Sequence, residues 1–319
     1  MILFGCQTQV PKVHVFVYDL SDPFIKGLSQ TLENQGKRHF DIVTHDAQNS
    51  QIIQNEMIVE VLEKESPHLL IVNPVDRLGA YTIIEKVKQE NIPIIFFNRE
   101  PLLRDLERYD QVYYVGSKAE ESGIFQAQII SNLVGGNPGK LNAVDVNADN
   151  TLQMVIFKGE QGHQDAEIRT DFVQSELIDL GYEIDVLKVI IANWSETEAY
   201  NHAKALFDVM YDEIEVIVSN NDAMALGIIQ AMQEYHTLQV DLDENYVPYA
   251  IPIVGIDGIE RALIMLQQGA LYGTVINDSY QQALAIIDLG LALLDNDLDG
   301  LNYTLTDGYY IWIPYKKVT

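Results

Sequence analysis

Short apolar runs alternate with longer amphipathic stretches along almost the whole chain. The runs are rich in Val and Ile and show no clear alternation of apolar and polar residues, which is typical of strands buried on both faces of a parallel sheet. They occupy residues 13–18, 41–44, 69–72, 92–97, 112–115, 154–157, 186–190, 215–218, 253–256 and 273–276.

The stretches between these runs have the periodicity of helices. They cover residues 24–35, 52–65, 78–90, 120–133, 166–180, 196–211, 223–234, 259–268 and 280–294. Because the order of strand then helix repeats along the chain, it predicts an α/β fold. The strands are too many for one doubly wound sheet, so we expect two lobes, with the chain crossing between them at weakly marked segments such as 116–117 and 277–279.

Several of the predicted strands end in a carboxylate or an amide. The pairs at these ends are Tyr18-Asp19, His45-Asp46, Phe97-Asn98, Asn221-Asp222, Ile256-Asp257 and Ile276-Asn277. In a parallel sheet the carboxyl ends of the strands open onto the crevice where ligands bind. Each residue taken singly is explained equally well as a cap of the following helix. Their repetition along one edge favours a groove for a small polar ligand.

Two local groups of residues add candidate ligand contacts. His163, Asp165 and Arg169 fall near one predicted helix start, with the last two on one helix face. They either point into the groove or form a capped helix start with a surface ion pair. Phe24 and Trp194 lie in loops after strands, where an aromatic ring either stacks on the flat face of a sugar or packs between lobes.

One loop carries an oxygen-bearing side chain at every second position. Its residues are Asp145, Asn147, Asp149, Thr151 and Gln153. This spacing matches the first part of an EF-hand calcium loop. Asn150 stands where that loop has Gly, although Asn tolerates the left-handed backbone, and Ile156 stands where it has the closing Glu. Calcium binding therefore needs a carboxylate from elsewhere in the chain, and without one the spacing is better explained by chance.

Composition narrows the classes of function. The 319 residues are 47% hydrophobic and 21% charged, as in globular proteins, and their net charge of −27 disfavours nucleic acid as a partner. Cys6 is the single cysteine, so no disulfide framework forms. No apolar run approaches the ~20 residues that span a bilayer. The chain also lacks a Gly-rich phosphate loop and a Gly-x-Ser-x-Gly elbow, so no enzyme motif stands out.

The first residues resemble the end of a bacterial lipoprotein signal. Leu3, Phe4 and Gly5 precede Cys6, the position that is acylated in such signals, whereas a basic start and a longer apolar region are missing. Either the signal is truncated or the match is chance. We interpret residues 1–11 as a tether and expect lipidation of Cys6, which would anchor a folded domain to a membrane surface.

Several motifs in order resemble the family of periplasmic galactose/glucose-binding proteins, the solute-binding components of ABC importers with the type I periplasmic binding fold. The motifs lie at residues 96–101, 113–116, 159–169, 220–224 and 273–278, and the resemblance covers the chain from about residue 13. It implies two doubly wound parallel-sheet lobes joined by a three-stranded hinge. Residues 12–116 plus 279–308 would form the N-terminal lobe, and residues 117–278 plus 309–319 the C-terminal lobe.

The resemblance also implies roles for individual residues. The pyranose would lie between the rings of Phe24 and Trp194. Its hydroxyls would be bound by Asp22, Asn98, His163, Asp165, Arg169, Asn221, Asp257 and Asn277. A structural calcium ion would be held by Asp145, Asn147, Asp149, Gln153, the Thr151 carbonyl and Glu215, which supplies the missing carboxylate. The loop at residues 19–22 is longer than in the family, which affects the pose of Asp22 and Phe24.

The function implied by the resemblance is binding without catalysis. We expect a monomer in the periplasm that binds one D-glucose or D-galactose between its lobes and delivers it to ABC permease subunits. Presentation of the closed form to a chemoreceptor is an additional reading. The alternative of a different class is an enzyme that processes a sugar or a nucleoside, and turnover of a labelled hexose would distinguish it.

Overall fold

The computed structural model describes residues 10–242 and 250–319. The lipidation site predicted at Cys6 lies outside the described residues, as does most of the predicted tether. The described chain forms two compact units. Unit 1 comprises the described residues up to Ser117 together with Ser279–Ile313, and unit 2 comprises Lys118–Asp278 together with Pro314–Thr319. The chain therefore passes between the units three times.

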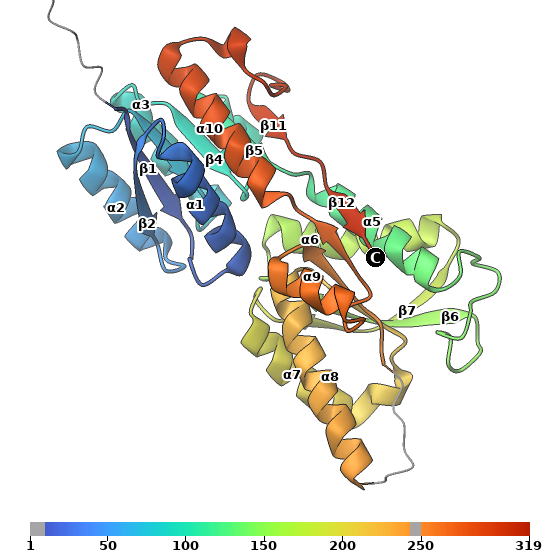
Figure 1. Ribbon diagram of the computed structural model, residues 1–319. Helices are drawn as coiled ribbons and strands as arrows, with labels where there is room; N and C mark the ends of the chain where they lie inside the picture. Colours follow the sequence, from blue (N-terminus) through green and yellow to red (C-terminus); the bar gives the residue numbers. More distant parts are fainter. Residues whose placement is uncertain (1–9, 243–249) are drawn as a thin grey trace, which may run out of the picture. The chain divides into compact units, whose positions relative to one another are not determined.

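Unit 1 contains a sheet of six strands. They are β1 (Lys12–Val17), β2 (Asp41–Asp46), β3 (Leu69–Val72), β4 (Ile94–Phe97), β5 (Val112–Gly116) and β11 (Tyr310–Trp312). All pair in parallel, in the order β11-β5-β4-β3-β1-β2 (Figure 1). Because β11 pairs with β5, the last crossing lies after Ile313, and the boundary expected after residue 308 is corrected accordingly.

Helices cover both faces of this sheet. They are α1 (Pro23–Gly36), α2 (Gln51–Lys64), η1 (Arg77–Gly79), α3 (Ala80–Gln89), α4 (Leu103–Leu106), α10 (Ser279–Asp295) and η3 (Leu298–Gly300). Phe16, Leu70 and Phe96 pack with apolar residues of α2 and α3 on one face. On the other face α1 and α10 lie side by side. Burial on both faces explains why the strands read as continuous apolar runs.

Unit 2 also contains a sheet of six strands, but one of its edge strands is antiparallel. Its strands are β6 (Thr151–Lys158), β7 (Glu183–Ile191), β8 (Val216–Ser219), β9 (Ile253–Asp257), β10 (Gly273–Ile276) and β12 (Lys316–Val318). Their order is β12-β10-β9-β8-β6-β7. Strand β12 is antiparallel to β10, whereas the other pairs are parallel. The predicted fold of two α/β lobes with parallel sheets is confirmed, with one antiparallel edge strand added.

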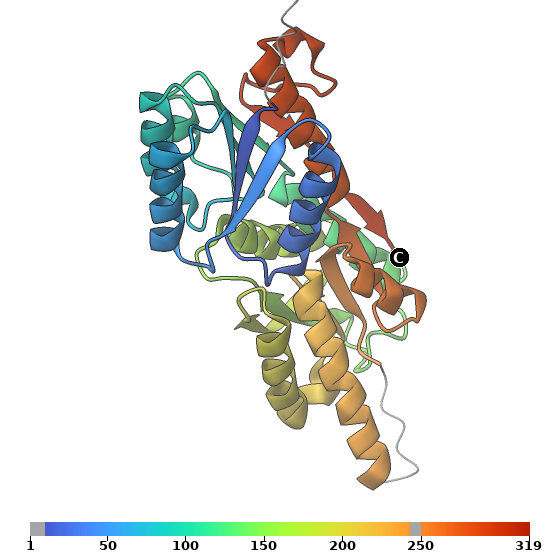
Figure 2. The ribbon, with the colours of Figure 1, turned by 60° about the vertical axis from the view of Figure 1, so that its left-hand side comes forward.

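The helices of unit 2 are α5 (Ala119–Leu133), α6 (Gln164–Asp179), α7 (Glu196–Met210), η2 (Tyr211–Glu213), α8 (Asp222–Leu242) and α9 (Glu260–Gln267). Along β6, Met154 and Ile156 pack toward α5 and α6, whereas Val155 and Phe157 pack toward α7 and α8. Helices α7 and α8 lie side by side (Figures 1 and 2). Successive residues of β6 thus alternate between two hydrophobic cores, one on each face of the sheet.

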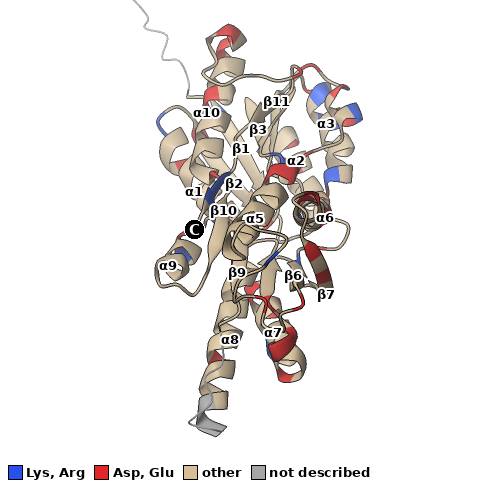
Figure 3. Cartoon of the chain, turned by 90° about the vertical axis from the view of Figure 1, so that its right-hand side faces the viewer, with Lys and Arg blue, Asp and Glu red and all other residues tan. Residues whose placement is uncertain are grey.

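Acidic residues are distributed over both units, including α7 and β7 (Figure 3). Among the helices of the described residues, none combines the length and the apolar composition needed to span a membrane.

Candidate functional site

The predicted ligand residues of unit 2 lie at the carboxyl ends of its parallel strands or in the first turns of the helices that follow. His163 precedes α6, which carries Asp165 and Arg169, whereas Trp194 follows β7. Asn221 follows β8, Asp257 ends β9 and Asn277 follows β10. This arrangement follows from parallel pairing, which brings the carboxyl ends of neighbouring strands to one edge of the sheet.

Arg169 is the centre of this group. Its guanidinium donates to the Asn220 carbonyl at 2.8 Å, to the Tyr315 hydroxyl at 3.2 Å and to Asp165 at 3.3 Å, and it lies 3.9 Å from Asp257. Burial by itself would lower the pKa of Arg169, but Tyr315 and the two carboxylates raise it above its usual value. The guanidinium therefore stays charged, and its pairing with Asp165 is not the exposed surface ion pair that the sequence left open.

Trp194 has an unusual backbone conformation for a large aromatic residue. Its φ is +63°, in the left-handed region that bulky side chains rarely adopt, and its carbonyl accepts from the Asn221 amide at 3.3 Å. The Arg169 guanidinium lies 5.7 Å from the indole centroid, and the His163 ring stands nearly perpendicular at 5.2 Å. A Cβ on Gly159 would come within 2.3 Å of the indole, so glycine is required beneath this ring.

His163 is the N-cap of α6. Its Nδ1 accepts from the Asp165 amide at 3.2 Å, so in the neutral ring the proton lies on Nε2. His163 therefore caps α6 through its Nδ1 atom.

Asn221, Asp257 and Asn277 are almost completely buried. The Asn221 carbonyl oxygen of the side chain accepts from the Met224 amide at 2.9 Å, which caps α8. The Asn277 amide donates to the Asp257 carbonyl at 3.1 Å, so the ends of β9 and β10 are tied together. Asp257 has a φ of +121°, a conformation that L-residues rarely adopt and that often marks functional positions.

The structure adds Asp222 to this group. It is fully buried, and it accepts from the Gly258 amide at 2.7 Å, the Ile259 amide at 3.1 Å and the Thr274 hydroxyl at 2.7 Å. Burial raises the pKa of Asp222 to about 7. The sequence signal was the Asn221-Asp222 pair at a strand end, from which only the first residue was assigned to the site.

Unit 1 carries its own group at the same edge of its sheet. Asp22 caps α1 by accepting from the Phe24 amide at 2.8 Å and from the Ile25 amide at 3.2 Å. It also accepts from the Tyr18 hydroxyl at 2.6 Å. Burial, followed by the charge of Asp22, raises the pKa of Tyr18, so its hydroxyl keeps its proton. Phe24 lies in the first turn of α1 rather than in the loop expected from the sequence, and it is 6% exposed.

Asn98 follows β4 with a φ of +61°. Its side-chain oxygen accepts from Asn73 at 3.3 Å, and Asn73 also donates to the Phe97 carbonyl at 3.3 Å. Arg99 is buried, lies 3.8 Å from the centroid of the Tyr18 ring and donates to the Val75 carbonyl. Sequence reasoning missed Asn73, although it directly follows β3 and obeys the same strand-end pattern.

The oxygen-rich loop of unit 2 folds as a turn around its own side chains. The Asp149 amide donates to Asp145 at 3.2 Å and to Asn147 at 2.9 Å, and Gln153 donates to Asp149 at 3.0 Å. Asn150 adopts a φ of +61°, so the left-handed turn forms with Asn in place of Gly.

Glu215 reaches this loop from the chain just before β8. It is 1% exposed, and its oxygens accept from the Val146 amide at 2.6 Å and the Gln153 amide at 3.0 Å. Burial raises the pKa of Glu215, and the charges of Asp145 and Asp149 add to this shift.

The donor set of this loop fits a hard cation. The Gln153 side-chain oxygen is buried and has no hydrogen-bond partner, and the neighbouring carboxylates repel one another. Both features would be relieved by an ion that prefers oxygen ligands. Among the described residues, no group of three or more His, Cys, Asp and Glu side chains is arranged to hold a metal ion.

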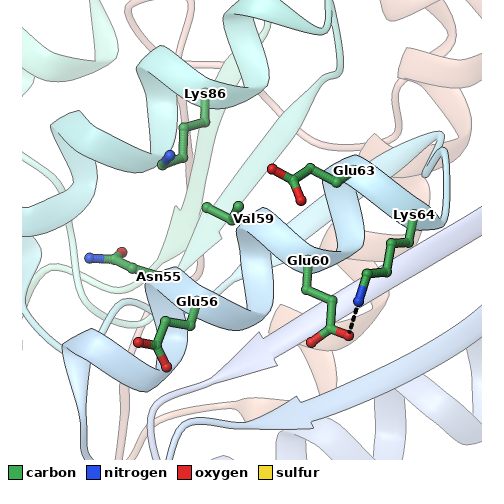
Figure 4. Close-up of a pocket in the computed structure, with 7 residues that line it drawn as sticks. All are labelled: Asn55, Glu56, Val59, Glu60, Glu63, Lys64 and Lys86. Atoms are coloured by element: carbon green, nitrogen blue, oxygen red, sulfur yellow. Dashed lines mark hydrogen bonds and ion pairs between the residues drawn. The ribbon is translucent and has the colours of Figure 1, made fainter.

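A separate groove lies on the surface of unit 1 between α2 and α3 (Figure 4). Its volume is about 420 Å³, and its lining is mostly charged, including Glu60 and Lys64, which form an ion pair at 2.9 Å. None of the predicted ligand residues lines it.

Comparisons with known proteins match a family model and several relatives over most of the chain. The model of a family described as a periplasmic binding protein domain matches residues 13–298. The D-galactose/methyl-galactoside binding periplasmic protein MglB of Haemophilus influenzae is 35% identical over 312 residues, covering 96% of this chain and 89% of that protein. A putative rhizopine-binding protein of Rhizobium meliloti is 28% identical over 281 residues, covering 88% and 80%.

Solved structures share the fold. An ABC transporter solute-binding protein of Bacillus halodurans with bound myo-inositol has a TM-score of 0.78 at 23% identity, covering 99% of this chain and 96% of that chain. A periplasmic solute-binding protein of Actinobacillus succinogenes with bound D-allose has a TM-score of 0.78 at 19% identity, covering 97% of each chain.

Proposed function

The chain belongs to the periplasmic binding protein family, and on that premise we propose that it binds one D-glucose or D-galactose and delivers it to an ABC permease. Membership of the family implies a location in the periplasm. The choice of hexose is supported by the similarity to MglB, whose name states galactose binding.

The observation that carries the proposal is the buried polar group around Arg169 beside the Trp194 ring. A pyranose presents flat C–H faces to an aromatic ring and hydroxyls that both donate and accept. Here Asp165 and Asp257 accept, whereas Arg169 donates. Because charged partners strengthen hydrogen bonds and burial penalises unpaired groups, such a site rejects sugars that lack a matched hydroxyl.

Unit 1 supplies the second half of the proposed contacts. Phe24 would take the sugar face opposite Trp194, and Asp22 and Asn98 would bind its hydroxyls. Binding to both units would shift the population toward a closed arrangement that the permease recognises. The proposed function is binding alone, which is supported by the membership of the chain in a family of periplasmic binding proteins.

Isothermal titration with D-glucose, D-galactose and myo-inositol tests this proposal. We expect one hexose per chain, tighter binding of a hexose than of myo-inositol, and unchanged hexose after long incubation. The variant Asn221→Ala should bind hexose more weakly than the wild type by about 1–3 kcal/mol, because a sugar hydroxyl loses its partner. A chemically altered sugar would instead favour a sugar-processing enzyme, and preference for myo-inositol would contradict the hexose assignment.

We also propose that the oxygen-rich loop holds one structural calcium ion. Its ligands would be Asp145, Asn147, Asp149, Gln153, the Thr151 carbonyl and Glu215. Bound calcium would neutralise the loop carboxylates and stabilise unit 2. Protein that has been stripped of metal by a chelator should therefore have a lower Tm than the calcium-loaded protein. Glu215→Gln should reduce this difference. Identical melting curves with and without calcium would contradict the proposal.

For Cys6 we propose acylation as a membrane anchor, supported by the Leu3–Gly5 segment that precedes it. Mass spectrometry of the protein from its native membrane fraction tests this, and an unmodified Cys6 in the mature protein would contradict it.

A further inference from the structure

We propose that Asp222 is a positioning residue, which holds the turn after β9 in the one conformation that presents Asp257 to the ligand. This inference rests on the proposed function and extends it to a residue that acts through its hydrogen bonds to the protein. It begins from the strained turn itself. Asp257 has a φ of +121° and Gly258 a φ of +70°, so the chain turns sharply at the point where the carboxylate must be aimed.

The strained turn is held by one carboxylate. A single oxygen of Asp222 accepts from both amides that follow Asp257, those of Gly258 at 2.7 Å and Ile259 at 3.1 Å. The other oxygen accepts from the Thr274 hydroxyl on β10 at 2.7 Å. Asp222 thus connects the start of α8, the end of β9 and the neighbouring strand, and it fixes the two peptide groups next to Asp257.

Two glycines show that the backbone is built around this contact. A Cβ on Gly255 would lie 2.1 Å from the Asp222 carboxylate, and a Cβ on Gly258 would lie 2.8 Å from the Ile276 side chain. Only glycine at these two positions lets β9, β10 and the carboxylate approach so closely.

Capping of α8 does not account for Asp222. An acidic residue in the first helical turn commonly serves the helix amides. Here Asn221 accepts from the Met224 amide and performs that role, whereas the Asp222 bonds are directed to β9 and β10. Asp222 is also completely buried, so a role in surface solvation is excluded.

The neutral form of this side chain keeps the same contacts. A protonated carboxyl can still accept both amides at one oxygen while its hydroxyl donates to Thr274. Burial raises the pKa of Asp222 to about 7, so the site already accommodates the neutral form near neutral pH. Asn has nearly the same shape as that form and likewise offers one accepting oxygen and one donating group.

Titration of hexose into a set of variants tests the proposal. Asp222→Ala should weaken binding by about tenfold or more, because the turn loses the partner of two amides. Thr274→Val should weaken binding less, and Asp222→Asn should restore most of the affinity lost in the alanine variant. In the Asp257→Ala background, Asp222→Ala should cause little further loss, because Asp222 acts through Asp257.

Asp105→Ala is the matched control. Asp105 is a buried carboxylate of unit 1 that pairs with Arg108 at 3.3 Å and contacts none of the predicted ligand residues. Its removal should lower the Tm and leave hexose affinity unchanged. Amide hydrogen exchange gives a second measurement: the Gly258 and Ile259 amides should exchange faster in Asp222→Ala and in Thr274→Val, but not in Asp105→Ala.

The outcomes separate this inference from the proposed function. Absence of hexose binding by the wild type would overturn the proposed function and this inference with it. Normal hexose binding by the wild type combined with equal affinity in Asp222→Ala, or with fully additive losses in the double variant, would overturn the positioning role alone. If Asp222→Ala does not fold, Thr274→Val decides: unchanged affinity and unchanged amide exchange overturn the role.

Discussion

At the scale of single residues, Trp194 is a predicted ligand residue that also has an unusual backbone conformation. Its ring is half-buried beside Arg169, and its backbone occupies the left-handed region. A bulky residue persists in that region only where surrounding structure fixes it. The Asn221 amide fixes the Trp194 backbone by donating to its carbonyl, and Gly159 leaves room for the ring because it has no side chain.

Replacement of Trp194 by Ala should weaken hexose binding by about 2–3 kcal/mol, because the stacked apolar area is lost. Hexose should also change the fluorescence of the wild type. The control is Trp312→Phe, since Trp312 stacks on Tyr310 at 4.9 Å within β11 and is the second of the two tryptophans. Fluorescence and calorimetric titrations measure both effects. Wild-type affinity in Trp194→Ala would contradict a stacking role.

Gly159→Ala should weaken hexose binding and alter the fluorescence of Trp194. The added Cβ would lie 2.3 Å from the indole, so the ring must move. The matched control is Gly27→Ala in α1, where nothing lies within 4 Å of an added Cβ. That change should raise the Tm slightly, since Ala costs about 0.5–1 kcal/mol less than Gly in a helix. Equal affinities in the two variants would contradict the packing argument.

At the scale of elements, β1 and β2 are joined by a pair of histidines. His14 Nδ1 and His45 Nε2 lie 2.9 Å apart, and Phe16 stacks on His45 with a centroid distance of 4.6 Å. Burial, followed by the proximity of His45, lowers the pKa of His14 to about 4. Burial also lowers the pKa of His45.

This pair predicts a loss of stability in acid. In the unfolded chain His14 takes up a proton near pH 6.5, whereas in the folded protein it does so only near pH 4. Its contribution is therefore complete above pH 6.5 and is lost as the pH falls toward 4, by about 1–3 kcal/mol.

Urea unfolding at several pH values measures this change. His14→Gln should flatten the pH dependence relative to the wild type, whereas His39→Gln at an exposed position should not. The comparison of wild type with His14→Gln is needed because Asp222 has an opposing effect on the pH dependence. The pKa of Asp222 is raised in the folded protein, so its contribution to stability falls as the pH rises from about 4 to 7. Parallel profiles for wild type and His14→Gln would show that the pair does not control this behaviour.

At the scale of the whole molecule, the predicted ligand residues are divided between two units, and the chain passes between these units three times. A ligand that contacts both units stabilises one arrangement of them over the others. Small-angle scattering should therefore show a smaller radius of gyration with saturating hexose than without it. Arg169→Ala, which removes a predicted ligand residue, should abolish the change at the same hexose concentration. A radius of gyration that is independent of hexose would contradict a closing motion.

The local pattern of the chain was sufficient to predict most of the elements. Apolar runs such as 69–72 and 216–218 are strands because residues buried on both faces must be apolar, a requirement that is visible without tertiary information. The polar residues after the strands were also visible, and Asp257 and Asn277 lie at the edge where parallel pairing places them. The roles of individual residues came from the resemblance to a family rather than from this pattern.

Only the tertiary structure decided which distant residues meet. Glu215 reaches a loop whose own spacing lacked a carboxylate, and Asp222 bonds a turn that follows a different strand. The last crossing, after Ile313, depends on the three-residue strands β11 and β12, which are too short for periodicity to reveal. Sequence periodicity reports burial along one element, whereas these contacts depend on how strands are ordered in the sheet, and that order is set by packing across the whole unit.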